Sequence, residues 1–348
     1  MAKILITSIR APGSLEWIRA LSKHHEVYGM DSLKYPVGRF SKHLKEYIQI
    51  CSPKSVGFEK VFLDILAKYE FDLIIPTSEE IFYIQKLSDK VLATDFIYNL
   101  HSKHIFSTMS FDHWSGHIPK TVLKMNNEIH NDLNYVFKPE YTRFGSEVYI
   151  CPENNHFIKN HPHDKWLQQE YIKGEEICSY TLAYEGEVIV NSFYKPVHRS
   201  GKAGTYFNWI IDDKLSLIIA EFIKHYKLSG QISFDIIKKE EYYYFIECNP
   251  RMTSGIYNVH HDILNNYVDI VLKSTSIKIN QPVNLKPSML CLLNIGNKGF
   301  FKADDVLYER NDKTPFFGQI ISFGEIILKA LITKQTLIET TVSDICYP

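Results

Sequence analysis

Residues 230–255 read GQISFDIIKKEEYYYFIECNPRMTSG, and this stretch contains two strand-like runs separated by a short polar turn. The runs 232–238 and 242–248 are rich in β-branched and aromatic residues, and the charged residues 239–241 separate them. The pattern predicts a β-hairpin.

A hairpin folded symmetrically about Glu241 places Asp235 directly opposite Glu247. Asn249 then shares the face of Glu247, because residues two apart in a strand point the same way. Two carboxylates facing each other across a ladder repel. A hard divalent cation such as Mg²⁺ removes this repulsion, since it binds carboxylate and amide oxygens and keeps positions open for water and phosphate. A solvated edge hairpin is the alternative, but the apolar run 243–246 before Glu247 favours a metal site.

The run FIECNPR at residues 245–251 resembles the metal-binding signature of the ATP-grasp superfamily. The similarity is to the carbamoyl-phosphate-synthetase-like and biotin-carboxylase-like branch, in which an apolar run precedes E-x-N-P-R. The resemblance implies that Asp235, Glu247 and Asn249 hold Mg²⁺ or Mn²⁺. It also implies that Arg251 reaches a phosphate oxygen.

Two lysines and a loop upstream resemble the phosphate site of the same family. Lys103 lies in a segment similar to the linker helix, and Lys138 lies in the strand whose lysine contacts the phosphates. Gly145 and Ser146 belong to a loop similar to the glycine-rich loop that closes over the phosphates with backbone N–H groups. The resemblance therefore assigns these residues to ATP binding.

Residues 166–176 resemble the hinge strand that holds adenine between the two subdomains of an ATP-grasp. The resemblance implies that the backbones of Glu170 and Ile172 supply the donor and acceptor for adenine. The side chain of Gln169 or Glu170 would then lie near the amino group, and Glu176 would bind the ribose hydroxyls.

Residues 194–205 predict a loop that is rich in cations and glycine. Arg199 and Lys202 are candidates for recognising a carboxylate or stabilising an acyl phosphate, because arginine makes bidentate contacts to planar oxyanions. The equivalent segment lines the acceptor site in the family. A solvated loop is the alternative.

The first hundred residues predict an open parallel α/β domain. The expected strands are residues 3–8, 26–30 and 71–76, and the expected helices are 14–24 and 58–69. Residues 7–13 have one glycine where G-x-G-x-x-G needs three, which disfavours a dinucleotide site. Ligands favour the carboxyl ends of such strands, so Ser8, Arg10 and residues 77–79 are candidate substrate contacts. A helix N-cap is the alternative for the last of these.

The expected architecture is therefore α/β and α+β. An open parallel α/β domain at residues 1–100 precedes a two-subdomain ATP-grasp fold at residues 101–272. Within the grasp, the lid subdomain covers about 101–168 and the second subdomain about 169–272. Residues 273–348 form an extension that we expect to pack on the grasp.

The composition excludes several other classes of protein. The 348 residues carry 39 Lys and Arg against 40 Asp and Glu, so no basic surface argues for nucleic acid or a membrane. The six cysteines form no CxxC pair, which favours free thiols in a reducing cytoplasm. The N-terminus has no signal-peptide pattern, and no apolar run approaches the ~18 residues that span a bilayer. We expect a cytoplasmic protein with small-molecule carboxylate and amine substrates, no nucleic-acid or membrane partner, and a capacity to form a homodimer.

The resemblance implies an ATP- and Mg²⁺-dependent ligase that acts through an acyl phosphate and releases ADP and phosphate. One alternative is an ATP-binding module without catalysis, favoured by the glycine-poor loop and by Ser102, where the family has Asp. Another is an ATP-grasp kinase that stops at phosphorylation. The complete set of Asp235, Glu247 and Asn249 favours an enzyme.

Overall fold

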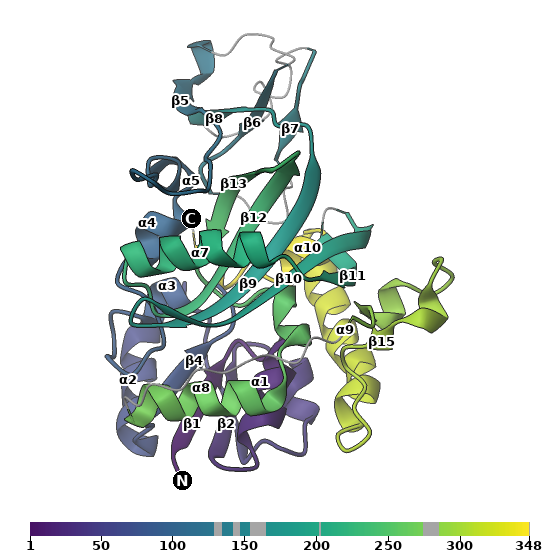
Figure 1. Ribbon diagram of the computed structural model, residues 1–348. Helices are drawn as coiled ribbons and strands as arrows, with labels where there is room; N and C mark the ends of the chain where they lie inside the picture. Colours follow the sequence, from purple (N-terminus) through teal and green to yellow (C-terminus); the bar gives the residue numbers. More distant parts are fainter. Residues whose placement is uncertain (129–133, 142–146, 154–164, 202, 274–284, 348) are drawn as a thin grey trace.

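The chain begins with a four-stranded parallel sheet in the order β3-β2-β1-β4 (Figure 1). This computed structural model describes residues 1–128, 134–141, 147–153, 165–201, 203–273 and 285–347. The strands are β1 (Lys3–Thr7), β2 (Glu26–Asp31), β3 (Glu46–Gln49) and β4 (Leu73–Pro76). The helices of this part are α1 (Ser14–Leu21), α2 (Phe58–Tyr69), α3 (Ile81–Ile84) and α4 (Ile97–His101). The predicted open parallel sheet is confirmed, and β3 is a strand that the sequence pattern did not indicate.

Both faces of this sheet are covered, which explains why its strands are apolar throughout. Ile4 and Ile6 pack in one core cluster with residues of α1 and α8 (His261–Lys273), whereas Leu5 packs on the opposite face with residues of α2. All three side chains are fully buried. Both faces of the sheet are thus occupied by helices, and the strands lie in the core of the N-terminal domain.

A seven-stranded sheet follows, in the order β13-β12-β9-β10-β11-β14-β15, and we call it the grasp sheet. Its strands are β9 (Glu175–Tyr184), β10 (Glu187–Ser200), β11 (Ala203–Ile210), β12 (Gly230–Lys239), β13 (Tyr242–Asn249), β14 (Ser288–Met289) and β15 (Asp304–Asp305). Helix α7 (Asp213–His225) covers one face, where Phe222 packs with Phe234 and Phe245. In this order, β12 and β13, which carry Asp235 and Glu247, lie at one edge of the sheet.

A smaller antiparallel sheet in the order β5-β8-β6-β7 lies above β12 and β13 in Figure 1, and we call it the lid sheet. Its strands are β5 (Thr121–Met125), β6 (Tyr135–Lys138), β7 (Tyr149–Ile150) and β8 (Lys165–Glu170). Helix α5 (Lys103–Phe106) leads into it. The junction of the lid sheet with the β12–β13 hairpin is where the predicted site residues meet.

The C-terminal segment contacts both the grasp sheet and the N-terminal domain. Strands β14 and β15 extend the grasp sheet, and α9 (Thr314–Thr333) then lies against the 3-10 turn Val37–Phe40. Helix α10 (Leu337–Thr340) follows. The remaining 3-10 turns are Asn126–Glu128, Ser254–Asn258, Cys291–Leu293 and Phe300–Lys302. Among the described residues, α9 is long and apolar enough to cross a membrane by length and composition, so the expectation that no apolar run approaches this length is wrong.

Candidate active site

The β12–β13 hairpin brings the three predicted metal ligands together. Asp235 pairs directly with Glu247, as the symmetric hairpin predicts, and Asn249 Nδ2 lies 3.5 Å from Asp235 Oδ2. The turn, at residues 240–241, is shorter than predicted, because a register shift after Asp235 leaves Ile246 as an extra residue. Bulges of this kind occur next to active sites, where they re-aim side chains.

The two facing carboxylates differ in their acidity. Burial, together with the neighbouring Glu247, raises the pKa of Asp235. Burial would also raise the pKa of Glu247, but Lys103 and Lys138 outweigh it and hold that pKa below its usual range. The two lysine Nζ atoms lie 3.6 and 4.0 Å from Glu247 Oε2, respectively. A cation bound between the two carboxylates would lower the pKa of Asp235, because it favours the ionised form and offsets the charge of Glu247.

The donor set fits a hard divalent cation. Asp235, Glu247 and Asn249 offer two carboxylates and an amide, the oxygen ligands that Mg²⁺ accepts. Within the described ranges, no group of three or more His, Cys, Asp and Glu side chains is placed to hold a metal ion. A site on this hairpin therefore depends on Asn249 and on oxygens from outside the chain, such as water and phosphate.

Lys103 enters the site from the start of α5. The helix is N-capped by Ser102, whose hydroxyl accepts the Ile105 N–H and donates to the carboxylate of Glu140. Lys103 is buried, and its Nζ donates to the Glu140 carbonyl at 3.2 Å. Ser102, where the family has Asp, is thus a structural cap that fixes the direction of Lys103.

Lys138 enters from β6 and is almost fully buried, at 2% exposure. Its Nζ donates to Gln169 Oε1 at 3.0 Å, and Gln169 in turn donates to Thr121 Oγ1 at 3.0 Å. Burial lowers the pKa of Lys138 to about 8, although Glu247 partly opposes this shift. Gln169, predicted to lie near adenine, therefore positions Lys138, the lysine predicted to contact the phosphates.

The predicted adenine hinge follows the end of β8. The Glu170 N–H donates to the Lys120 carbonyl at 2.8 Å, and the Tyr171 N–H donates to the Asn134 carbonyl at 2.7 Å. Ile172 has a buried side chain and lies in the link between β8 and β9. In the described part of the chain, no residue is hydrogen-bonded to the Ile172 backbone. Of the two predicted hinge backbones, that of Ile172 has its polar groups free for a ligand.

Glu176 and Arg199, predicted to bind ribose and substrate respectively, are paired with each other. Arg199 Nη2 lies 2.7 and 2.6 Å from the two carboxylate oxygens of Glu176. Both side chains are partly exposed, Glu176 at 45% and Arg199 at 34%. The pair joins adjacent strands β9 and β10 and is accessible from solvent.

The prediction of a loop at residues 194–205 is wrong. Strand β10 continues to Ser200, β11 begins at Ala203, and the two strands pair with register shifts around His198. Buried aromatic side chains on both strands, such as Tyr194 and Phe207, hold this hairpin in the sheet despite its proline and glycines. Lys202, Gly145 and Ser146, which the sequence assigns to the substrate and phosphate sites, lie outside the described residues.

Arg251 extends the cluster toward the N-terminal domain. Its Nη2 donates to Asn249 Oδ1 at 3.1 Å, and its Nε lies 3.6 Å from Glu79 Oε1. Glu79 is buried, at 1% exposure. The alternative interpretation of residues 77–79 as a helix N-cap is wrong, because the N-cap of α3 is Glu80, whose carboxylate accepts the Thr77 N–H. The sequence analysis did not predict the ion pair between Arg251 and Glu79. The pattern that could have indicated it is an acid, Glu79, just after the carboxyl end of a parallel strand.

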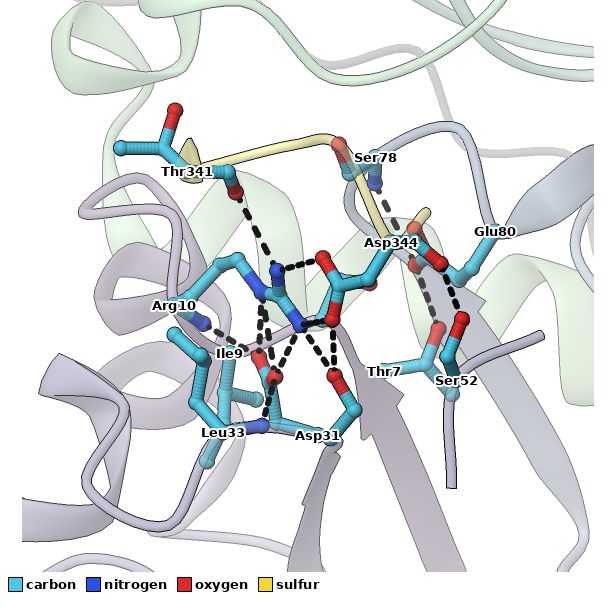
Figure 2. Close-up of polar contacts among 12 residues, drawn as sticks. Thr7, Ile9, Arg10, Asp31, Leu33, Ser52, Ser78, Glu80, Thr341 and Asp344 are labelled. Carbon is cyan, nitrogen blue, oxygen red and sulfur yellow. Dashed lines mark hydrogen bonds and ion pairs between the residues drawn. The ribbon is translucent and has the colours of Figure 1, made fainter. Parts of the chain in front are cut away.

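The candidate substrate contact Arg10 is engaged within the protein (Figure 2). Its guanidinium lies between Asp31 and Asp344, at 2.6 and 2.5 Å, and its side chain is 6% exposed. A cavity of about 20 Å³, lined in part by Ser8 and Asp31, lies beside it. This is room for about one water molecule. The C-terminal tail therefore occupies the strand ends where a ligand was expected.

Comparison with known proteins agrees with this arrangement. Residues 106–255 match the family model of the ATP-grasp domain. The chain therefore contains an ATP-grasp domain at residues 106–255, as its metal-binding signature indicates. No curated protein matches the chain.

Solved structures share the fold across most of the chain. The L-amino acid ligase from Bacillus licheniformis has a TM-score of 0.62 at 10% identity and covers 78% of this chain and 74% of its own. The biotin carboxylase domain of 2-oxoglutarate carboxylase from Hydrogenobacter thermophilus, solved with MgADP, ADP and bicarbonate, has a TM-score of 0.64 at 13% identity and covers 81% and 72%. N5-carboxyaminoimidazole synthetase from Staphylococcus aureus has a TM-score of 0.62 at 13% identity and covers 82% and 80%. At these identities the likeness establishes the fold.

Proposed function

We propose that this protein is an ATP- and Mg²⁺-dependent ligase that joins a carboxylate to an amine or another nucleophile. The reaction proceeds through an acyl phosphate and releases ADP and phosphate. The observation that carries the proposal is the convergence of buried Lys103 and Lys138 on Glu247, beside Asp235 and Asn249.

The charge of this cluster suits a polyphosphate. Two buried ammonium groups share one carboxylate, and Arg251 adds a third cation at the far side of Asn249. Charge-assisted hydrogen bonds to phosphate oxygens would complete the coordination of these cations. Transfer of a phosphoryl group needs mainly positioning and charge stabilisation, which this cluster provides.

Three solved relatives of the same fold support the assignment by their described activities. One is an L-amino acid ligase, one is a synthetase, and one is a carboxylase domain solved with MgADP and bicarbonate. The ATP-grasp domain at residues 106–255 gives this chain the same scaffold.

The proposed chemistry has two steps. A substrate carboxylate oxygen attacks the γ-phosphorus of ATP, and the bond to the bridging oxygen breaks to release ADP. The nucleophile then attacks the acyl carbon, the bond to the phosphate breaks, and the nucleophile loses its proton. Lys103, Lys138 and Arg251 hold the phosphoryl oxygens in line throughout. A bound Mg²⁺ neutralises the charge that develops on the transferred phosphoryl group.

The adenine is expected at the link between β8 and β9, where the Ile172 backbone remains available for hydrogen bonds. Glu176 reaches the ribose only if Arg199 releases it or is shared with the ligand. Nucleotide binding is therefore coupled to the β9–β10 ion pair. The same rearrangement would free Arg199 to meet the substrate carboxylate.

The test is release of ADP and phosphate from Mg-ATP with pooled amino acids and small carboxylates. A ligase releases ADP and inorganic phosphate in equal amounts and only with the pool. A kinase releases ADP while the phosphate stays on the substrate. Binding of ATP without release from any pool favours a non-catalytic module and contradicts the proposal.

The matched variants are Glu247→Gln and Glu240→Gln. Both remove one carboxylate from the same hairpin, but Glu240 lies exposed at the turn. We expect Glu247→Gln to lower turnover by at least about 10²-fold, the size expected for a lost charge-stabilising group, and Glu240→Gln to retain it. Equal turnover in the two variants would contradict the assignment of the metal site.

A further inference from the structure

Helix α9 packs on the protein by its small and polar side, the reverse of an ordinary surface helix. Gly318 and Ser322 are buried, and Gly318 lies against the ring of Phe40. Glu325 accepts the backbone N–H groups of Lys34 and Tyr35 at 2.9 and 2.7 Å. These contacts fix which side of α9 faces the N-terminal domain.

The opposite side of α9 is a continuous apolar face. Its eight large side chains are 38–73% exposed: Phe317, Ile320, Ile321, Phe323, Ile327, Leu328, Leu331 and Ile332. Only 17% of the most apolar 18-residue stretch of this helix is buried. Helix α9 is therefore not a core helix. Large side chains that are half exposed each present on the order of 100 Å², so the face exceeds the largest apolar patch of an ordinary monomer, roughly 300–600 Å².

Exposed cations border this face at both helix ends. Arg310 and Lys313 precede the helix and Lys334 follows it, and all three are exposed. None of the three forms an ion pair with another described residue. The neighbouring acids are engaged: Asp312 pairs with Arg19, and Glu325 accepts backbone N–H groups.

A second exposed apolar side chain, that of Phe301, precedes α9 in the C-terminal segment. In the sequence Lys298-Gly299-Phe300-Phe301-Lys302, the side chain of Phe301 is 96% exposed and both lysines are exposed. Figure 1 places this region, next to β15, on the same side of the molecule as α9. Aromatic rings flanked by lysines are typical of segments that meet the headgroup region of a bilayer.

We propose that the apolar face of α9 docks on an anionic lipid surface. The eight apolar side chains enter the boundary between headgroups and acyl chains, and the flanking cations bind the acidic headgroups. The helix lies in the interface and does not span it, because its other side is fixed to the N-terminal domain through Glu325 and Gly318. Membrane attachment of this kind goes beyond the proposed ligase activity and departs from the expectation drawn from the sequence.

The charge at the helix ends argues against a second copy of the chain as the occupant. Two α9 helices packed antiparallel around a twofold axis would bring Lys313 of each copy close to Lys334 of the other. Like charges at such short range oppose association. An acidic lipid surface attracts the same cations and also accepts the apolar side chains. We therefore take a membrane as the partner of this face.

The test is flotation of the purified full-length chain with vesicles of phosphatidylcholine alone or with phosphatidylserine added. We expect binding to the acidic vesicles that weakens as salt rises. Replacing Ile321, Leu328 and Leu331 together by Gln should weaken the binding at least about tenfold, because it removes apolar area at the centre of the face. Replacing Arg310, Lys313 and Lys334 by Gln should weaken it by about fivefold per charge.

The matched control is Ile211→Gln with Leu217→Gln, two apolar side chains as exposed as those on α9 but next to or on α7. This pair should float as the unchanged protein does, and thermal unfolding checks that every variant is folded. No flotation, or equal flotation of the α9 variant and the control, overturns the proposal. A dimer in solution that the α9 variant converts to a monomer, without vesicle binding, assigns the face to a second copy instead.

Discussion

Lys138 is the residue on which the electrostatics of the candidate site most depend. Its ammonium group is buried between Gln169 and Glu247, and burial lowers its pKa to about 8. Burying a charge is costly unless partners compensate it. A buried lysine with a pKa this close to neutrality is typical of a functional position.

Lys138→Met keeps the volume of the side chain and removes the charge. We expect turnover to fall by roughly 10²–10³-fold, the cost of losing a preorganised charge at a phosphoryl group, with little loss of stability. Steady-state ADP release and thermal unfolding measure the two effects. Lys239→Met, at an exposed position of the same grasp sheet, is the control that should retain activity.

The lowered pKa of Lys138 also predicts a pH dependence of ATP affinity. The charged form of Lys138 is populated below about pH 8 and is lost as the pH rises through that value. We therefore expect the affinity for ATP to fall above about pH 8, and Lys138→Met to lack this dependence. An affinity that is flat to pH 10 in the unchanged protein would contradict the role of this lysine.

Glu79 and Glu80 are adjacent buried acids with different partners. Glu79 pairs with Arg251, whereas Glu80 accepts the Thr7 hydroxyl and the Thr77 N–H. Glu79→Gln should reduce turnover about tenfold through Arg251 and leave the unfolding temperature nearly unchanged. Glu80→Gln should leave turnover intact and lower the free energy of unfolding by roughly 1–3 kcal/mol, because it weakens a buried hydrogen-bonded carboxylate. If Glu79→Gln instead lowered the free energy of unfolding and left turnover intact, Glu79 would be a structural residue.

At the scale of elements, the C-terminal tail closes over the carboxyl ends of the parallel sheet. Asp344 accepts from Arg10 and from the Ser32 hydroxyl, and the Ser52 hydroxyl donates to its carbonyl (Figure 2). Although burial opposes it, Arg10 holds the pKa of Asp344 below its usual range. A depressed carboxyl pKa stabilises the fold above the pKa of the unfolded chain, and this stability is lost as the pH falls through the folded pKa.

Asp344→Asn should therefore destabilise the protein at neutral pH and have a smaller effect in acid. We expect a loss of roughly 1–3 kcal/mol at pH 7, as for a lost charged hydrogen-bond partner. Denaturant unfolding at pH 7 and near pH 3 compares the two conditions. A loss that is equal at both pH values would show that the ion pair with Arg10 contributes nothing.

Elements with strong local signals were predictable, and those set by distant contacts were not. The spacing of Asp235 and Glu247 about a polar turn fixed the hairpin pairing, and the parallel strands follow from their apolar runs. Residues 194–205 contain proline and glycine, which locally favour a loop, but aromatic packing keeps them in the sheet. No local pattern foretells that Asp344 returns to Arg10, 334 residues away.

At the scale of the whole molecule, the candidate site exists only where three parts meet. Lys103 comes from the linker helix, Lys138 from the lid sheet, and Glu247 from the grasp sheet. The sequence predicted all three as site residues, because each lies in a motif of its own. It could not reveal how Glu176 and Arg199 pair, since that contact depends on the register of β9 with β10.

A ligand that binds all three parts should hold them together. We expect Mg-ATP to raise the unfolding temperature of the protein, because a ligand that binds only the folded state stabilises it by RT ln(1 + L/Kd), where L is the concentration of free ligand.

Calorimetric titration of ATP, with Mg²⁺ or with EDTA, tests the central claim that Lys103, Lys138 and the acidic hairpin form one ATP and metal site. The unchanged protein should bind ATP more tightly with Mg²⁺ than with EDTA. Glu247→Gln should lose most of that difference, and Glu240→Gln should keep it. Mg²⁺-independent binding, equal binding by the two variants, or no ATP binding at all would contradict the account.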